Sequence, residues 1–300
     1  MERYILKTIS MDKIWGDERL KAYGATSAHT GIVYSCAAIE GIDSPVGQTT
    51  LRTLIQKTPT AFGLLPKEEY PIIVSFDAAK MDVSVQVHPT DLFAQDQEGK
   101  PYGKCEAWYF IEAPKKGWVY AENVEESKDS IKEAIAKKDF HQALKKYPVK
   151  SEDLLFTPAG TVHCLTSGAL IYEIQQSTNI TYRLYDYDRT DEKGNKRALH
   201  VEKALATMNP MNKEIKQTFH AGRRASFYAF DLMHKHMQDH ISNPSDIAAV
   251  CTVLSGRILV DNTLVEPGTS ILLMPKETVS IDGQADCIMA TPNPYWREIE

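Results

Sequence analysis

Short runs of alternating apolar and polar residues recur along the chain and predict β-strands over most of its length. The clearest run spans residues 82–88, where Val83, Val85 and Val87 alternate with polar residues and therefore share one face. Pro89 ends the predicted strand. Its polar face, with Ser84, Gln86 and His88, either meets solvent or lines a site.

Further strands are predicted at 72–77, 106–112, 154–157 and 169–175, and the strand pattern resumes from about Thr218. Many short strands separated by turns favour a β-sandwich or a barrel over a helical fold. The predicted fold class is therefore mainly β.

Helical periodicity interrupts the strands at about 123–148. Ile131, Ala134 and Ile135 mark one helix face, and Phe140 to Tyr147 suggest a second short helix before Pro148. This small helical insertion is interpreted as a lid or packing element. A later helix is predicted near 201–208.

A weak internal repeat divides the chain. Residues 152–163 can be aligned with 269–280, where Ser280 stands in place of His163, although chance similarity over twelve residues is a competing explanation. We predict a metal-binding β-domain over 1–210 and a second, metal-free β-domain over 211–300.

Composition narrows the class of protein. A net charge of -6 argues against nucleic-acid binding, and no segment approaches the length of apolar sequence that crosses a membrane. Five scattered cysteines form no CxxC motif, and the first residues lack an apolar signal segment, so a cytoplasmic location is expected. The chain contains no GxSxG, phosphate-loop or GxGxxG motif.

Three residues in strand-like contexts form a candidate metal site: His88, Glu106 and His163. Two imidazoles and one carboxylate suit a borderline divalent ion with an open coordination position, which is typical of a catalytic metal site. Inward-facing side chains of a jelly-roll barrel can bring such distant positions together. Gln86, on the same strand face as His88, is a possible fourth ligand.

The chain resembles the type I phosphomannose isomerases in their short bacterial form. The resemblance rests on SVQVHP, GKCEAWY, PAGTVH and EIQQSTNITYRLYDYDR, which occur in the family's order within roughly residues 12–208. It implies two cupin-type jelly-roll domains and a zinc-dependent interconversion of mannose 6-phosphate and fructose 6-phosphate without an organic cofactor. It also implies a sugar phosphate as the small-molecule partner; the oligomeric state stays open.

The resemblance assigns further site residues. The family's ligand positions fall on His88, Glu106 and His163, with Gln86 as a possible fourth, and its catalytic arginine falls on Arg183. Lys104 and Glu173 match other active-site positions, and Ser84 matches a substrate-contacting one.

The chemistry of aldose–ketose isomerisation is compatible with these residues. The reaction moves a proton between C1 and C2 through an enediolate, so it needs a base and a positive charge near the developing oxyanion. Glu173 and Lys104 are both candidates for the base. Arg183 can stabilise the enediolate or the phosphate, or it can simply pair with Asp186 or Asp188.

Two departures from the family pattern leave other functions open. The segment from Lys21 through Gly24 to His29 lacks the acid and tryptophan that usually precede Ser-Ala-His, and Ser75 stands where the family tends to place a lysine. The alternatives are a metal-binding cupin paralogue that binds or senses a sugar, and an isomerase of a related sugar.

Overall fold

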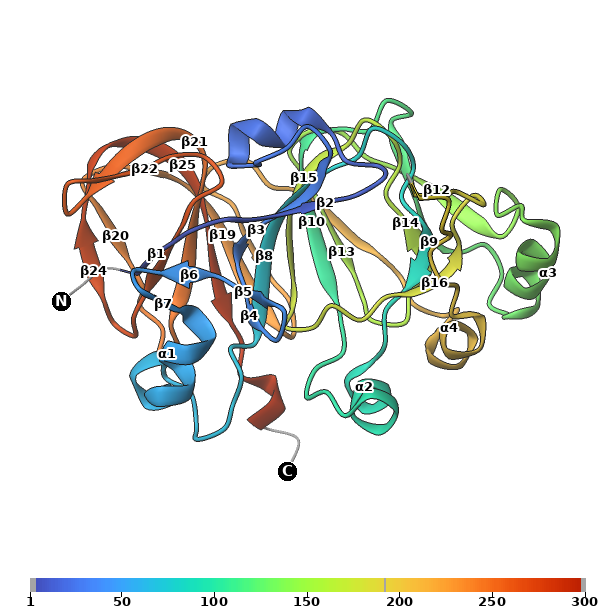
Figure 1. Cartoon of the computed structure of the whole chain (residues 1–300), viewed down its shortest axis with the longest axis horizontal. Coiled ribbons are helices and arrows are strands. Elements are labelled where there is room, and N and C mark those ends of the chain that lie inside the picture. Colours follow the sequence, from blue (N-terminus) through green and yellow to red (C-terminus); the bar gives the residue numbers. More distant parts are fainter. Residues whose placement is uncertain (1–3, 192, 298–300) are drawn as a thin grey trace. The chain divides into compact units, whose positions relative to one another are not determined.

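The computed structural model describes residues 4–191 and 193–297 and is mainly β, which confirms the predicted fold class (Figure 1). Its contacts divide the chain into two compact units. The first unit contains the segments up to Asp12, Glu18–Phe76 and from Phe219 onward, and the second contains Lys13–Asp17 and Asp77–Thr218. No helix in the described ranges is long and apolar enough to cross a bilayer.

This division differs from the predicted boundary near residue 210. Residues 18–76 group with the C-terminal segment instead of with the residues that follow them in sequence. The division depends on contacts between distant segments, which local strand patterns do not contain. That the unit around residues 219–297 lacks a metal stays a prediction.

The first unit is built around one antiparallel sheet with strand order β1-β23-β21-β25-β19-β18, and β22 pairs with β21 (Figure 1). Its buried residues include Cys251, Val253, Ile271 and Ile288, and their neighbours along these strands are buried as well. The strands β2, β3 and β8 lie side by side in that order. The elements of this unit are β1 (Tyr4–Leu6), β2 (Ile9–Asp12), β3 (Thr30–Cys36), β4 (Ala38–Ile39), β5 (Ile42–Asp43), β6 (Pro45–Val46), β7 (Thr49–Thr50), α1 (Leu51–Lys57), β8 (Ile72–Ala78, with its last two residues in the second unit), β18 (Arg224–Ser226), β19 (Phe230–Met237), β20 (His240–Ser242), β21 (Ala249–Val260), β22 (Thr263–Val265), β23 (Ser270–Leu273), β24 (Thr278–Ser280), β25 (Asp282–Pro292) and the 3-10 turns Glu18–Tyr23, Pro59–Phe62 and Tyr295–Arg297.

The second unit carries two sets of strands, in the orders β17-β13-β10-β15 and β12-β11-β14-β9-β16. Its elements are β9 (Val85–Val87), α2 (Asp91–Glu98), β10 (Glu106–Glu112), β11 (Trp118–Asn123), α3 (Asp129–Lys137), β12 (Leu144–Pro148), β13 (Asp153–Thr157), β14 (His163–Cys164), β15 (Leu170–Gln176), β16 (Tyr182–Tyr185), α4 (Val201–Thr207) and β17 (Ile215–Thr218). Val85 and Val87 form one core cluster with Ile131 of α3 and Ala204 of α4. The helices α3 and α4 therefore cover the apolar face of β9, and Gln86 projects from the opposite face of this strand.

Two local predictions need correction. The second helix expected before Pro148 is wrong, because Leu144–Pro148 forms β12 and pairs antiparallel with β11. From Lys145 on, its residues alternate between half-buried and exposed positions, which is the two-residue period of a strand. The predicted strand at 82–88 is shorter than expected and covers only Val85–Val87. The helix near 201–208 is confirmed as α4.

Gly63 closes the turn Pro59–Phe62 with φ 74°, and a Cβ there would lie 1.9 Å from the carbonyl oxygen of Asp246. We expect Gly63→Ala to destabilise the fold by about 2–5 kcal/mol, since it combines left-handed strain with a steric clash. Gly41→Ala is the matched control, because Gly41 has φ 81° but open space around its Cβ position. Denaturant unfolding measures both variants, and equal losses would show that the clash has no cost.

Candidate metal centre and active site

A row of three residues crosses one sheet of the second unit. Gln86 of β9 is paired with His163 of β14 on one side and with Arg183 of β16 on the other. Side chains of directly paired residues project from the same face of a sheet. An imidazole, an amide and a guanidinium therefore lie next to one another, although they come from three distant segments.

The other sheet supplies the carboxylates. Glu106, the first residue of β10, pairs with Thr157 and Gln175, and Trp108 two residues later pairs with Glu173 of β15. The period of two places Glu106 and Glu173 on the same face. Trp108 is buried, and its indole contacts the His163 ring edge-on at 5.5 Å between centroids.

His88, Glu106 and His163 converge on one point. One ligand atom from each lies within 4.8 Å of the others, and all three side chains are buried. Glu106 Oε2 is 3.2 Å from His88 Nε2, and Glu106 Oε1 is 3.4 Å from His163 Nε2. The Nε2 of His88 makes no well-directed hydrogen bond among the described residues. It faces Glu106 Oε2, which also lies 3.0 Å from Lys104 Nζ.

The outer hydrogen bonds determine the histidine tautomers. His88 Nδ1 lies 2.9 Å from the carbonyl oxygen of Ile180, and His163 Nδ1 lies 2.9 Å from that of Thr161. A carbonyl oxygen only accepts, so each Nδ1 carries the proton and each Nε2 carries a lone pair. Two lone pairs turned toward a carboxylate repel unless a cation lies between them, and this arrangement is typical of metal-ligating histidines.

The charge states also suit a cation. Burial, followed by the charge of Lys104, lowers the pKa of His88 to about 3, and burial also lowers the pKa of His163. Burial acts to raise the pKa of Glu106, but Lys104 and the two histidines hold it well below its ordinary value. At neutral pH both imidazoles are neutral and the carboxyl is ionised, which is the form that binds a metal.

Gln86 is oriented by its neighbours. Ser84 Oγ donates to Gln86 Oε1 at 3.0 Å, and Gln86 Nε2 lies 3.3 Å from His163 Nε2. Because the Nε2 of His163 carries a lone pair, the amide donates to it. A half-turn of the amide would present its oxygen as a fourth ligand instead.

Lys104 bridges two carboxylates beside this cluster. Its Nζ lies 3.0 Å from Glu106 Oε2 and 3.2 Å from Glu173 Oε1. The pKa of Glu173 is raised well above its ordinary value, mainly by burial and further by Glu106 and Asp77, while Lys104 opposes the shift. Glu173 is therefore a stronger base than an exposed glutamate.

Arg183 is a partly buried cation beside this cluster. Within residues 4–191 and 193–297 its guanidinium makes no ion pair, and its Nε has no hydrogen-bond partner. Burial and the like charge of Arg197 lower its pKa. The expected alternative, pairing with Asp186, does not occur because Arg189 and Arg197 occupy that carboxylate.

Sequence reasoning missed two charged residues of this unit. The pKa of Lys13 is lowered by burial, and the charges of Arg197 and Arg183 lower it further. The negative charge of Asp77 opposes this shift of Lys13 and raises the pKa of Glu173. The signal for Asp77 was an acid at the end of an apolar run. Lys13 had none, because it reaches the region through the pairing of Gly16 with Ala79.

Three further histidines lie close together in the sequence, at positions 234, 236 and 240. His236 and His240 are exposed, whereas His234 is buried and bonds through Nδ1 to the carbonyl oxygen of Phe219 at 2.7 Å. They contribute no group to the metal-ligand clusters found among the described residues.

Comparison with known proteins decides the family. Over 226 residues the chain is 32% identical to the mannose-6-phosphate isomerase ManA of Bacillus subtilis, a match that covers 73% of this chain and 72% of ManA. Over 212 residues it is 34% identical to the mannose-6-phosphate isomerase of Streptococcus mutans, covering 68% and 67% of the two chains. The chain belongs to the mannose-6-phosphate isomerase family.

Other comparisons agree with this family. The probable mannose-6-phosphate isomerase GmuF of Bacillus subtilis is 34% identical, although the match spans only 66% of its length. The crystal structure of the mannose 6-phosphate isomerase from Bacillus subtilis superposes with a TM-score of 0.82 at 25% identity, covering 97% of this chain and 100% of that one. A putative mannosephosphate isomerase from Archaeoglobus fulgidus shares the fold, with a TM-score of 0.79 at 17% identity and coverage of 98% and 99%. No family model matches the chain.

Proposed function

We propose that this member of the family is a zinc-dependent isomerase that interconverts mannose 6-phosphate and fructose 6-phosphate through an enediolate. The observation that carries the proposal is the convergence of two imidazole lone pairs and an ionised carboxylate beside the Lys104–Glu173 pair. The printed names of the relatives support the substrate.

The ligand set favours zinc among the common divalent ions. His88, Glu106 and His163 would hold the ion, and the amide of Gln86 would occupy a fourth position or support His163. Zinc with an open position would supply polarisation of the sugar oxygens. Trp108, buried against His163, excludes water from one side of the cluster.

Glu173 is proposed as the base that carries the proton between C1 and C2 of the sugar. Its raised pKa matches the task, because a base works best when its pKa lies near the operating pH. Lys104 holds Glu173 and Glu106 in one arrangement and adds positive charge. Arg183, which lacks an anionic partner among the described residues, would bind the phosphate or the enediolate oxygen. Ser84 orients Gln86 and is proposed to contact the substrate.

The acidic limb of the pH profile should belong to Glu173. Since burial raises its pKa, the carboxyl keeps its proton at pH values where an exposed glutamate is ionised. We expect kcat/KM to rise as pH increases through that raised pKa and to level off above it. Glu173→Gln should abolish this limb along with most turnover, whereas the exposed Glu202→Gln control should keep the profile. An unchanged limb in Glu173→Gln would assign it to another group.

A coupled assay with mannose 6-phosphate, on zinc-loaded and chelator-treated protein with metal content measured in parallel, tests the proposed function. Turnover that disappears with the metal and returns with zinc is expected. Full zinc occupancy without turnover would indicate a sugar-binding paralogue instead.

An isomerase of a related, unphosphorylated sugar is the second candidate. Ser75, buried in β8, stands where the family tends to place a lysine, and Asp77 two residues later adds a negative charge. Both features weaken the attraction for a phosphate. Turnover of mannose without turnover of mannose 6-phosphate would favour this candidate.

The remaining assignments also belong to the proposal. The five cysteines are free and buried, which suits a reducing cytoplasm. The net charge of -6 argues against binding of a nucleic acid, so a small sugar phosphate is the expected partner.

A further inference from the structure

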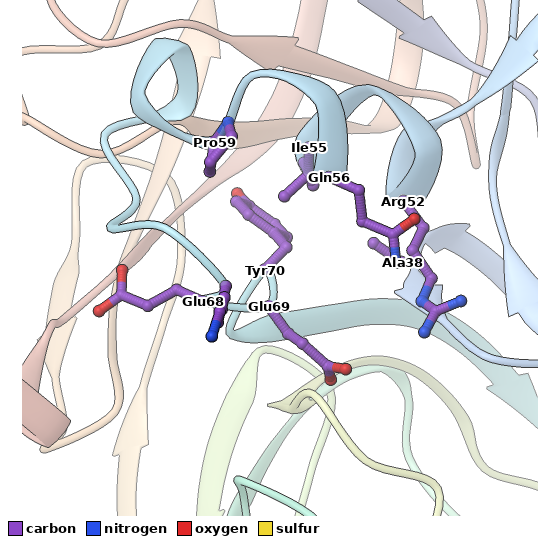
Figure 2. Close-up of a pocket in the computed structure, with 9 residues that line it drawn as sticks. Ala38, Arg52, Ile55, Gln56, Pro59, Glu68, Glu69 and Tyr70 are labelled. Atoms are coloured by element: carbon purple, nitrogen blue, oxygen red, sulfur yellow. The ribbon is translucent and has the colours of Figure 1, made fainter.

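A cavity of about 330 Å³ lies in the first unit, between α1 and the segment leading to β8. Figure 2 shows Arg52, Ile55 and Gln56 of α1 on one side, and Glu68, Glu69 and Tyr70 on the other. All its lining residues belong to the first unit, whereas His88, Glu106 and His163 belong to the second. Its volume is at the lower end of the range for small-molecule sites.

Arg52 is the unusual member of this cavity. Its Nε is buried and has no hydrogen-bond partner, and its guanidinium makes no ion pair among the described residues. The nearby carboxylate of Asp43 accepts instead from the backbone N–H of Arg52 at 2.9 Å. An arginine that is partly desolvated without an acceptor is costly, and a bound anion would compensate that cost.

The backbone holds Arg52 in place. α1 begins at Leu51, and the side chain of Thr50 caps it by accepting from the N–H of Thr53. Leu51, which precedes Arg52, and Ile55, which follows it, are both buried. Rotation of the helix about its axis would therefore expose apolar surface. The guanidinium is therefore directed by a packed helix and not by a mobile loop.

Of the two acids that line the cavity, Glu68 is already engaged. Glu68 accepts from Trp296 Nε1 at 2.8 Å, from the backbone N–H of Leu65 at 2.7 Å and from Arg297, whose closest contact is 2.6 Å. These hydrogen bonds, led by those of Arg297 and Trp296, hold its pKa below the ordinary value although burial acts to raise it.

The remaining charges leave the cavity positive. Arg52 and Lys67 contribute two positive charges, Glu69 contributes one negative charge, and the Glu68–Arg297 pair cancels. Gln56 adds an amide, while Ile55 and Tyr70 provide apolar wall. The set matches a small monoanion with a short carbon skeleton.

We propose that this cavity binds a small organic anion whose carboxylate or phosphate group pairs with Arg52. Gln56 and Lys67 supply further hydrogen-bond donors to the same group, and the carbon skeleton lies against Ile55 and Tyr70. The site is independent of the proposed isomerase reaction, so the test below uses no activity measurement.

The test follows the side-chain Nε–H resonance of Arg52 by NMR in the full chain. The resonance is assigned by its absence from Arg52→Gln, and inorganic phosphate and lactate are titrated separately against sodium chloride at equal ionic strength. We expect a saturable shift with at least one of the two probes. A tighter phosphate response identifies a phosphate monoester as the ligand class, and a tighter lactate response identifies a carboxylate.

The side-chain amide resonance of Gln56, which lines the same cavity, gives the affinities of the parent and of the Arg52 variants. Arg52→Lys keeps the charge but loses the planar fork, so we expect binding about tenfold weaker or more. Lys57→Gln, at the exposed end of the same helix, should leave the affinity unchanged. The absence of a saturable shift up to about 50 mM of either probe would overturn the proposal. Equal affinities of the parent and Arg52→Lys would overturn it as well.

Discussion

Replacing His163 by alanine is expected to abolish stoichiometric binding of a divalent metal. The variant removes one of the two imidazole lone pairs that face Glu106 in the described part of the chain, and the neighbouring Gln86 loses the acceptor of its amide N–H. Since changes outside the ligand shell already cost about 10–100-fold in affinity, loss of a ligand should cost more. Metal content after dialysis against a zinc buffer measures the effect.

His236→Ala is the matched control for this experiment, because His236 is an exposed histidine of the other unit that contacts Asp286. It should bind metal like the parent chain. Stoichiometric zinc in His163→Ala, with the fold intact by circular dichroism, would remove the proposed site.

Replacing Arg183 by alanine is expected to retain the metal but to lower kcat/KM by about 100- to 1,000-fold, which is typical for loss of a group that stabilises developing negative charge. Arg183 makes no ion pair among the described residues, so its removal leaves no buried carboxylate unpaired. The fold and the metal content should therefore survive. Steady-state kinetics with mannose 6-phosphate, together with metal analysis, separate the two effects.

Arg257→Ala serves as the control, since Arg257 is an exposed arginine of the first unit. Its kinetic constants should equal those of the parent chain. A rate near normal in Arg183→Ala would assign Arg183 a structural role. A parallel loss of zinc would show that it supports the ligands instead of the substrate.

The candidate ligand set was predictable from sequence because its elements are local. Three local patterns indicate which side chain projects from which strand. They are an alternating stretch that ends in His88, a strand that begins at Glu106 and a Pro-x-Gly turn before His163. The same patterns predicted a mainly-β fold and the helix α4 near 201–208. The second helix before Pro148 failed because pairing with β11 overrode a weak helical pattern.

The sequence alone therefore determined the chemical groups available to this protein and the strands that carry them. Only the tertiary structure decided the tautomers of His88 and His163, the bridging position of Lys104 and the missing partner of Arg183. It also decided the grouping of residues 18–76 with the C-terminal segment and the cavity around Arg52. The physical reason is that each of these features depends on distances between segments far apart in the chain, which no local pattern of hydrophobic and polar residues contains.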